Sequence, residues 1–173
     1  MLNLGKPITA PVLIPVIHSS TPKCINDPFM VDGECWKVTA LAFNSPHGVV
    51  FVDDVTAVDV AKIGSALGTH KLFPKGASIV FAEVSDNNTL KARVWQYGFG
   101  EVEYSDEAAG AAAVAAMMTQ KTRKDEINVQ MLGNNADVNR DENGNIILTP
   151  AEKTSAEEDS VKIVYQMGKS YAS

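Results

Sequence analysis

One stretch in the second half of the chain, residues 93–116, constrains the fold more than any other. It reads RVWQYGFGEVEYSDEAAGAAAVAA, which predicts a strand, a turn bracketed by Gly98 and Gly100, and an alanine-rich helix that begins at Ser105-Asp106-Glu107. A helix start below a glycine-rich turn normally attracts an anion, because its free N–H groups and its dipole point outward. Two carboxylates already stand at this start, so we expect the chain to fill its own anion site.

Composition and charge exclude several classes of function. The 173 residues suffice for one domain with a sizeable core, and a net charge of −6 without a basic stripe argues against nucleic acid as a partner. The longest apolar run, residues 108–118, is too short to span a bilayer, and Met1 leads directly into the predicted fold without a signal peptide. We therefore expect a soluble protein without a transmembrane segment.

The two cysteines, Cys24 and Cys35, lie in neither a CxxC motif nor a metal-binding spacing. They favour two free thiols in a reducing compartment, such as the cytoplasm, the plastid stroma or the mitochondrial matrix. A disulfide between them and a catalytic thiol are the alternatives. Because Cys35 lies in a predicted strand, we expect it to be buried as a small hydrophobe. His18 and His70 lack acidic or cysteine partners at metal-ligand spacing, so no metal site is expected.

The remaining pattern predicts long strands packed against two helices, a mixed α/β architecture. Prolines divide residues 6–29 into extended or loop pieces. Helices are predicted over 58–68, with Gly68 as the stop, and over 106–120, and residues 151–160 are expected to form a loop or a solvated helix. Strands are predicted over 2–4, 35–43, 49–52, 79–84, 90–95, 127–132, 136–140, 145–149 and 161–167, with 79–84 and 90–95, and 136–140 and 145–149, as hairpins.

Five motifs follow one another along nearly the whole chain. They are NSPHGVVFVDD at 44–54, FPKGAS at 73–78, RVWQYGFGE at 93–101, SDEAAG at 105–110, and the Asn-Gly hairpin with LTPAE at 143–152. In this order they resemble the diaminopimelate epimerases, cofactor-independent isomerases of lysine and cell-wall biosynthesis. The resemblance implies no cofactor and an α+β fold, in which a mixed, mainly antiparallel sheet wraps around a central alanine-rich helix. It also implies a single domain over 1–173, shortened at the N-terminus, whose segments 1–14 and 161–173 are strands of a missing domain's sheet.

The departures from the family pattern bear on activity. The family uses two cysteines, one to remove the α-proton and one to return a proton on the opposite face. Here the first has no counterpart and the second aligns with Ser105, whose hydroxyl is a much weaker acid than a thiol. The family's glycine-rich cradle for the substrate carboxylate becomes Asp106-Glu107-Ala108. A ligand carboxylate about 4 Å from one fixed carboxylate is repelled by about 4 kcal/mol at an effective dielectric constant near 20.

The family's substrate-binding positions are largely changed as well. Its two asparagines align with Ser45 and Ser78, and its Glu-Arg clamp aligns with Gln96 and Tyr97. We expect Tyr97, Phe99 and Tyr104 to fill the old pocket, the alternative being that they line a changed ligand site. The remnant pocket positions are Ser45, Ser78, Gln96, Tyr97, Gly98, Gly100 and Glu101.

The catalytic candidates are His47, Ser105, Asp106 and Glu107. Each also has a structural interpretation: a satisfied histidine, an N-cap, and acids that favour the helix dipole. The leading hypothesis is therefore a catalytically inactive member, retained as a structural, assembly or binding subunit in a homodimer or a larger complex. The first alternative is an isomerase, epimerase or lyase, independent of pyridoxal phosphate, that acts on an amino-acid-like substrate with Asp106, Glu107 or His47 at a site shared with a partner chain. The second is a binding module for a neutral or cationic small molecule.

Overall fold

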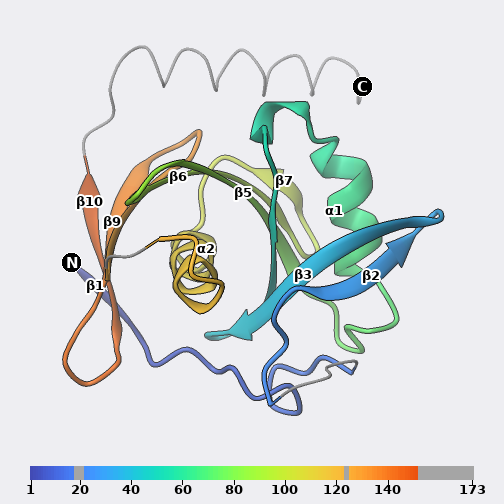
Figure 1. Ribbon diagram of the computed structural model, residues 1–173, viewed down its shortest axis with the longest axis horizontal. Coiled ribbons are helices and arrows are strands. Elements are labelled where there is room, and N and C mark those ends of the chain that lie inside the picture. Colours follow the sequence, from blue (N-terminus) through green and yellow to red (C-terminus); the bar gives the residue numbers. More distant parts are fainter. Residues whose placement is uncertain (18–21, 123–124, 152–173) are drawn as a thin grey trace.

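A curved sheet wraps around one helix and carries a second helix on its outer side (Figure 1). The computed structural model describes residues 1–17, 22–122 and 125–151. The central helix is α2 (Asp106–Met118). The outer helix is α1 (Val60–Gly68), which follows the short 3-10 helix η1 (Val55–Ala57). Within the described ranges, no helix has the length and apolar character needed to cross a membrane.

The described residues form one ten-stranded sheet in the order β1-β10-β9-β8-β6-β5-β4-β3-β2, with β7 paired on β6. The β4–β5 and β6–β8 pairs are parallel, and the other pairs are antiparallel. This arrangement confirms the mixed, mainly antiparallel sheet around an alanine-rich helix. The strands are β1 (Leu2–Gly5), β2 (Asp27–Val31), β3 (Glu34–Ala42), β4 (Pro46–Phe51), β5 (Ser78–Asp86), β6 (Thr89–Gln96), β7 (Gly100–Val102), β8 (Glu126–Gln130), β9 (Asn135–Arg140) and β10 (Ile146–Ala151).

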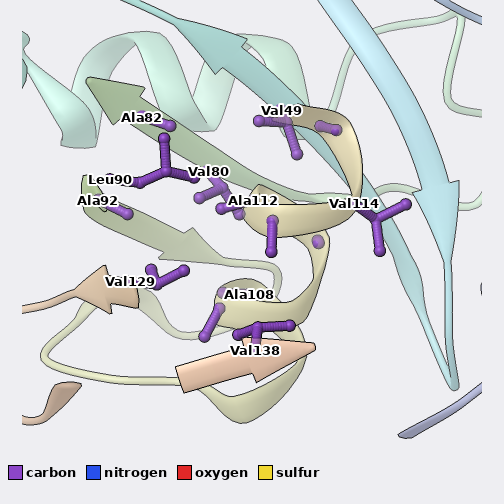
Figure 2. Packing of buried hydrophobic residues seen from close by; sticks show 14 of the residues in the cluster. Val49, Val80, Ala82, Leu90, Ala92, Ala108, Ala112, Val114, Val129 and Val138 are labelled. Carbon is purple, nitrogen blue, oxygen red and sulfur yellow. The ribbon is translucent and has the colours of Figure 1, made fainter. Parts of the chain in front are cut away.

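The central helix is almost completely buried because its side chains are small. Every residue from Ala108 to Ala116 is buried. Figure 2 shows short side chains of α2 between valine and leucine side chains of the surrounding strands. Gly110 lets the side chain of Leu4 on β1 pack closely against the helix, since a Cβ at this position would lie 2.5 Å from its Cδ1. A helix that is apolar all round belongs in the centre of a protein, and here its small residues let the sheet close around it.

A second core lies on the outer face of the sheet, beneath α1. There the indole of Trp95 on β6 packs against two glycines of the helix. A Cβ at Gly64 would lie 2.5 Å from the Trp95 side chain, and one at Gly68 only 2.3 Å from it. The helix ends at Gly68, as predicted, and Thr69 is the C-cap. The glycine is needed for close packing and not for a left-handed turn.

Most predicted elements are confirmed, including both hairpins and both helices, with end points that differ by a few residues. The strand β2 was not predicted as such, since it begins at Asp27, within the segment predicted to form extended or loop pieces, and contains Pro28. Proline lacks a donor, but β2 is the edge strand of the sheet, where the loss is tolerated. The short strand β7 was also not predicted.

The two chain ends bear on the expected missing domain. The segment 1–14 contains β1, which pairs with β10 at the end of this sheet. The predicted segments 151–160 and 161–167 lie, apart from Ala151, outside the described residues. The assignment of 1–14 and 161–173 to another domain's sheet therefore stays a prediction.

Both cysteines are free thiols, as predicted. The expectation that Cys35 is buried is wrong, because Cys35 is exposed, whereas Cys24 is fully buried. Cys35 lies near the β2–β3 turn, opposite the exposed Met30, where the hairpin extends past the core. Burial and the neighbouring Asp27 carboxylate raise the pKa of Cys24 to about 12.

Candidate functional site

The start of α2 is bonded to the turn between β3 and β4 through Glu107. Its Oε1 accepts hydrogen bonds from the backbone N–H of Asn44 at 3.1 Å, from the N–H of Ser45 at 3.3 Å, and from the Ser45 hydroxyl at 3.4 Å. One carboxylate oxygen thus takes three donors that point toward the helix start. The chain does supply its own anion here, although the donors belong to the neighbouring turn rather than to the helix.

Ser105 is the N-cap of α2, as the sequence predicted. Its backbone is extended, and its Oγ accepts a hydrogen bond from the N–H of Ala108 at 3.2 Å. Asp106 is exposed next to it. Burial, a hydrogen bond to Asp106 and the charge of that carboxylate raise the pKa of the Tyr104 hydroxyl. Tyr104 therefore stays protonated at neutral pH and donates to Asp106.

An open cleft of about 620 Å³ lies beside this helix start. Its lining consists of residues 2–5 of β1 together with Asn44, Asp106 and Glu107. Two carboxylates therefore face the cleft. Its electrostatics disfavour an anionic ligand and favour a neutral or cationic one.

His47 lies at the start of β4 and is only 2% exposed. Its Nδ1 lies 3.0 Å from the carbonyl oxygen of Ser45. Burial lowers the pKa of His47, against the opposing effects of that carbonyl and of the Glu107 charge. His47 is therefore neutral at pH 7, with Nδ1–H donating to Ser45, which agrees with the structural interpretation of this residue.

His70 adds no site to the described part of the chain. In His70, Nε2 lies 3.1 Å from the carbonyl oxygen of Met30, and Nδ1 accepts from the N–H of Leu72 at 3.2 Å. Both ring nitrogens of His70 are thus used by the backbone. His18 lies outside the described residues. Within the described part of the chain, no group of three or more His, Cys, Asp or Glu side chains is placed to hold a metal ion.

The start of β4, the start of β5 and the end of β6 lie side by side in the sheet, next to His47. Ser78 pairs with His47 across the parallel β4–β5 ladder, and its Oγ accepts from the N–H of Tyr97 at 3.0 Å. Side chains alternate along each strand, and the residues two further along from His47 and Ser78, Val49 and Val80, pack against α2. His47 and Ser78 therefore face α2, as does Gln96 by the same alternation on β6.

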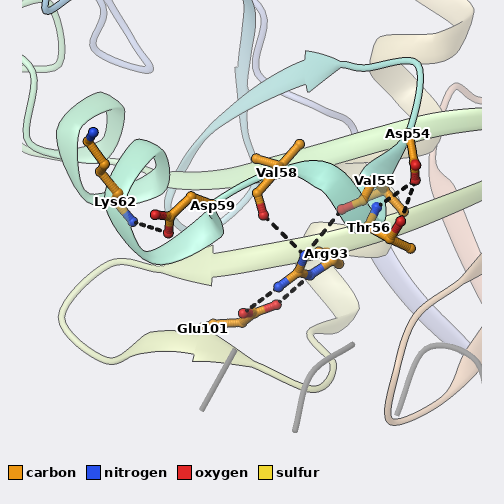
Figure 3. Close-up of polar contacts among 8 residues, drawn as sticks. All are labelled: Asp54, Val55, Thr56, Val58, Asp59, Lys62, Arg93 and Glu101. Carbon is orange, nitrogen blue, oxygen red and sulfur yellow. Dashed lines mark hydrogen bonds and ion pairs between the residues drawn. The ribbon is translucent and has the colours of Figure 1, made fainter. Parts of the chain in front are cut away.

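Glu101 lies on the opposite face of the sheet and does not join this group. It forms a bidentate ion pair with Arg93, at 2.8 and 2.9 Å, and the same guanidinium donates from Nη1 to the carbonyl oxygens of Val55 and Val58 at 3.2 Å (Figure 3). The pair fastens the β6–β7 hairpin to the segment before α1. Sequence reasoning missed Arg93 as its partner: Glu101 is paired with Trp95, so Arg93 is its diagonal neighbour across the β6–β7 hairpin, a position that long side chains can still bridge.

The β6–β7 turn has the glycine conformations expected from its sequence. Gly98 and Gly100 have φ values of 85° and 97°. The turn does not fill the pocket as predicted, because Phe99 is 80% exposed and Tyr97 is 49% exposed. The Tyr97 ring rests on Gly76, where an added Cβ would lie 2.3 Å from it.

A curved mixed sheet closed around an alanine-rich helix, whose start faces a cleft lined by β1 and Asn44, defines an epimerase-like fold. The family model for diaminopimelate epimerase matches residues 39–171, and the chain belongs to this family. It is 32% identical over 162 residues to diaminopimelate epimerase of Desulforapulum autotrophicum, covering 94% of this chain and 56% of that protein. It is 33% identical over 153 residues to diaminopimelate epimerase of a Geobacillus strain, covering 87% of this chain and 54% of the relative.

The chain thus spans about half the length of the curated relatives it matches. Among solved structures, a phenazine biosynthesis protein of the PhzF family from Bacillus anthracis is similar, with a TM-score of 0.47 and 14% identity. That match covers 66% of this chain and 38% of the other.

Proposed function

We propose that this chain is a catalytically inactive member of the diaminopimelate epimerase family that serves as an assembly or binding subunit. The observation that carries the proposal is the position of Glu107. Its carboxylate takes three donors at the place where the family resemblance puts substrate-binding groups, and it faces the cleft together with Asp106. An amino-acid carboxylate entering this cleft meets two negative groups.

The available acids and bases also argue against epimerisation, which needs one group to remove the α-proton and another to return a proton. Ser105 is committed to capping the helix. The thiol of Cys24 is buried, and its pKa of about 12 keeps it protonated. His47 is enclosed and held by the backbone of Ser45. These contacts leave the described site without a thiolate or a solvent-accessible imidazole.

The proposal is tested by hydrogen exchange at the α-carbon. The purified chain is incubated with diaminopimelate in D₂O, and deuterium at the α-carbon is followed by NMR, with a full-length family enzyme as the positive control. We expect no incorporation above the uncatalysed rate. Incorporation that scales with protein concentration overturns the proposal.

The open cleft favours a second candidate function, proton transfer at a site shared with a partner chain. In this case Asp106 or Glu107, with His47 as a neutral hydrogen-bonding group, acts on an amino-acid-like substrate. The same exchange experiment with a panel of amino acids tests it. Loss of exchange in Asp106→Asn and Glu107→Gln, both matched in shape, identifies a carboxylate as the base, and equal rates in all variants exclude this candidate.

The proposed assembly is a homodimer or a larger complex, in a reducing compartment compatible with two free thiols. Support comes from large apolar side chains that lie on the surface, including Val12, Leu13 and Phe99.

A further inference from the structure

We infer that a groove near the C-terminal end of α2 binds a short-chain monocarboxylate. The carboxylate lies between Lys23 and Arg140, and the apolar chain lies against Met117 and Met118. This groove, named here the methionine groove, is separate from the acidic cleft at the other end of the same helix. The inference goes beyond the proposed function, because it holds whether or not the chain is catalytically inactive.

The base of the methionine groove is apolar and belongs to the central core. Val114, Met117 and Met118 come from the last two turns of α2, and Ile146 is the first residue of β10. Val114 and Ile146 are 5% and 1% exposed, so they form a fixed base, whereas both methionines are only partly buried. Methionine is unbranched and adapts its shape to a bound apolar group. The groove therefore offers an adjustable apolar surface on a rigid support.

The size of the groove limits its ligand to a small molecule. Its volume is about 180 Å³. A water molecule takes about 30 Å³ in the liquid, so the space corresponds to about six atoms of that size. It is smaller than the pockets of about 300–1,000 Å³ that hold drug-sized ligands. An unbranched chain of about five carbons fills such a space and leaves a polar end group at the rim.

The charges of the groove select a negative end group. Lys23 and Arg140 both line it, and its lining includes no acidic side chain among the described residues, in a chain with a net charge of −6. The C-terminal end of α2 opposes an anion, but its effect is that of about half an elementary charge, against two full positive charges. The groove thus has the opposite electrostatic preference to the acidic cleft.

Arg140 already binds a carboxylate in this structure. Its Nη2 donates to Oδ1 of Asp125 at 2.8 Å, and its backbone N–H donates to the carbonyl oxygen of the same residue at 3.2 Å. The two side chains are 45% and 67% exposed. This ion pair uses one of the five guanidinium N–H donors, and the planar guanidinium suits a carboxylate in particular. Asp125 is therefore a competitor of the proposed ligand, and its removal should strengthen binding.

NMR of the methionine methyl groups tests the site. The chain is labelled with ¹³C at these methyls and titrated with sodium hexanoate at constant pH and ionic strength. We expect the Met117 and Met118 signals to follow one saturable curve with a dissociation constant of about 1 mM. The signal of Met30, which is 54% exposed on β2, should stay unchanged. The absence of a saturable shift, or an equal shift of Met30, overturns the inference.

Related ligands separate the effect of the chain from that of the charge. Acetate lacks the chain and hexylamine reverses the charge, so both are expected to bind at least about 10-fold more weakly than hexanoate. Hexylamine or acetate binding as tightly as hexanoate overturns the inference. Hexyl phosphate binding more tightly than hexanoate overturns the assignment to a carboxylate.

Two variants with opposite expected effects complete the test. Arg140→Gln is expected to raise the dissociation constant of hexanoate about fivefold, and Asp125→Asn to lower it about threefold. Lys75→Gln is the control, because it removes one positive charge at an exposed position outside the groove. Circular dichroism verifies that the variants fold. Unchanged affinity in Arg140→Gln, or an equal loss in Lys75→Gln, overturns the inference. Deuterium incorporation into an amino acid would refute the inactive role and leave hexanoate binding intact, so the two failures are distinguishable.

Discussion

Oε1 of Glu107 lies 3.1 Å from the backbone nitrogen of Asn44, a residue 63 positions earlier in the chain. The same oxygen receives both donors of Ser45. This contact joins the start of the buried helix to the turn that precedes β4. The same carboxylate thus orders the turn and, together with Asp106, gives the cleft its negative charge.

Replacement of Glu107 by alanine removes the acceptor of three donors at a partly exposed position. We expect Glu107→Ala to lower the free energy of unfolding by about 1 kcal/mol, the usual net value for hydrogen bonds of this kind. Glu107→Gln keeps an acceptor oxygen and is expected to lose less. Thermal unfolding measures both variants. Because the vacated donors suit a carboxylate, acetate is expected to raise the melting temperature of Glu107→Ala more than chloride at equal ionic strength, and an equal response to both salts would contradict this.

Removal of the ion pair between Arg93 and Glu101 is expected to destabilise the fold more than removal of the Glu107 carboxylate. The side chain of Arg93 is 9% exposed and that of Glu101 is 18% exposed. Arg93→Ala strands a largely buried carboxylate and leaves two backbone carbonyls, those of Val55 and Val58, without their donor. We expect a loss of about 3 kcal/mol in urea unfolding. Arg93→Lys keeps the charge without the two-pronged geometry and is expected to fall between wild type and alanine. If the free energy of unfolding of Arg93→Ala equals that of the wild type within error, the pair contributes little to stability.

The buried His47 predicts a specific pH dependence. Its pKa is lowered in the folded state, so between the folded and the unfolded pKa the unfolded chain binds more protons. The contribution of His47 to the free energy of unfolding is therefore fully present above the pKa of the unfolded chain, about 6.5. It decreases as the pH falls below that value, by at most about 1.4 kcal/mol per pH unit. His47→Asn retains a donor for the Ser45 carbonyl and does not titrate. We expect its stability to decline less than that of the wild type from neutral to mildly acidic pH, and parallel curves from denaturant unfolding would contradict this.

The two thiols are expected to differ in reactivity. Burial keeps Cys24 protonated and out of contact with solvent, whereas Cys35 is exposed. Iodoacetamide at mildly alkaline pH should modify one thiol in the native protein and both in denaturant, as counted by mass spectrometry. In the control variant Cys35→Ser, the native protein should remain unmodified. Rapid native labelling of Cys24 would show that its site opens readily.

Local patterns were sufficient to predict much of the fold. The alanine-rich run after Ser105 specified α2 and its N-cap, and the polar turns at 85–88 and 141–144 specified two hairpins. Such features depend on neighbours within a few residues, so a single sequence contains them. β2 was missed because Pro28 contradicts a strand locally, and only its place at the edge of the sheet makes it acceptable.

The candidate site was less predictable because its contacts link distant segments. The alternation of β6 and the pairing of β7 place Glu101, one of the remnant pocket positions, on the face opposite His47. The bond from Glu107 to Asn44 depends on how α2 is oriented inside the sheet, which no local pattern states. Exposure of Phe99 likewise depends on what the hairpin tip packs against, and neighbouring residues do not determine that.

The pairing of Leu2 with Leu148 has a consequence for the order of events in folding. It joins β1 to β10, the first and the last of the described strands, so it closes a far longer loop than the hairpins beside it. The entropic cost of closing such a loop must be met before the contact is rewarded, so we expect this ladder to form after the local hairpins and to complete the covering of α2 late.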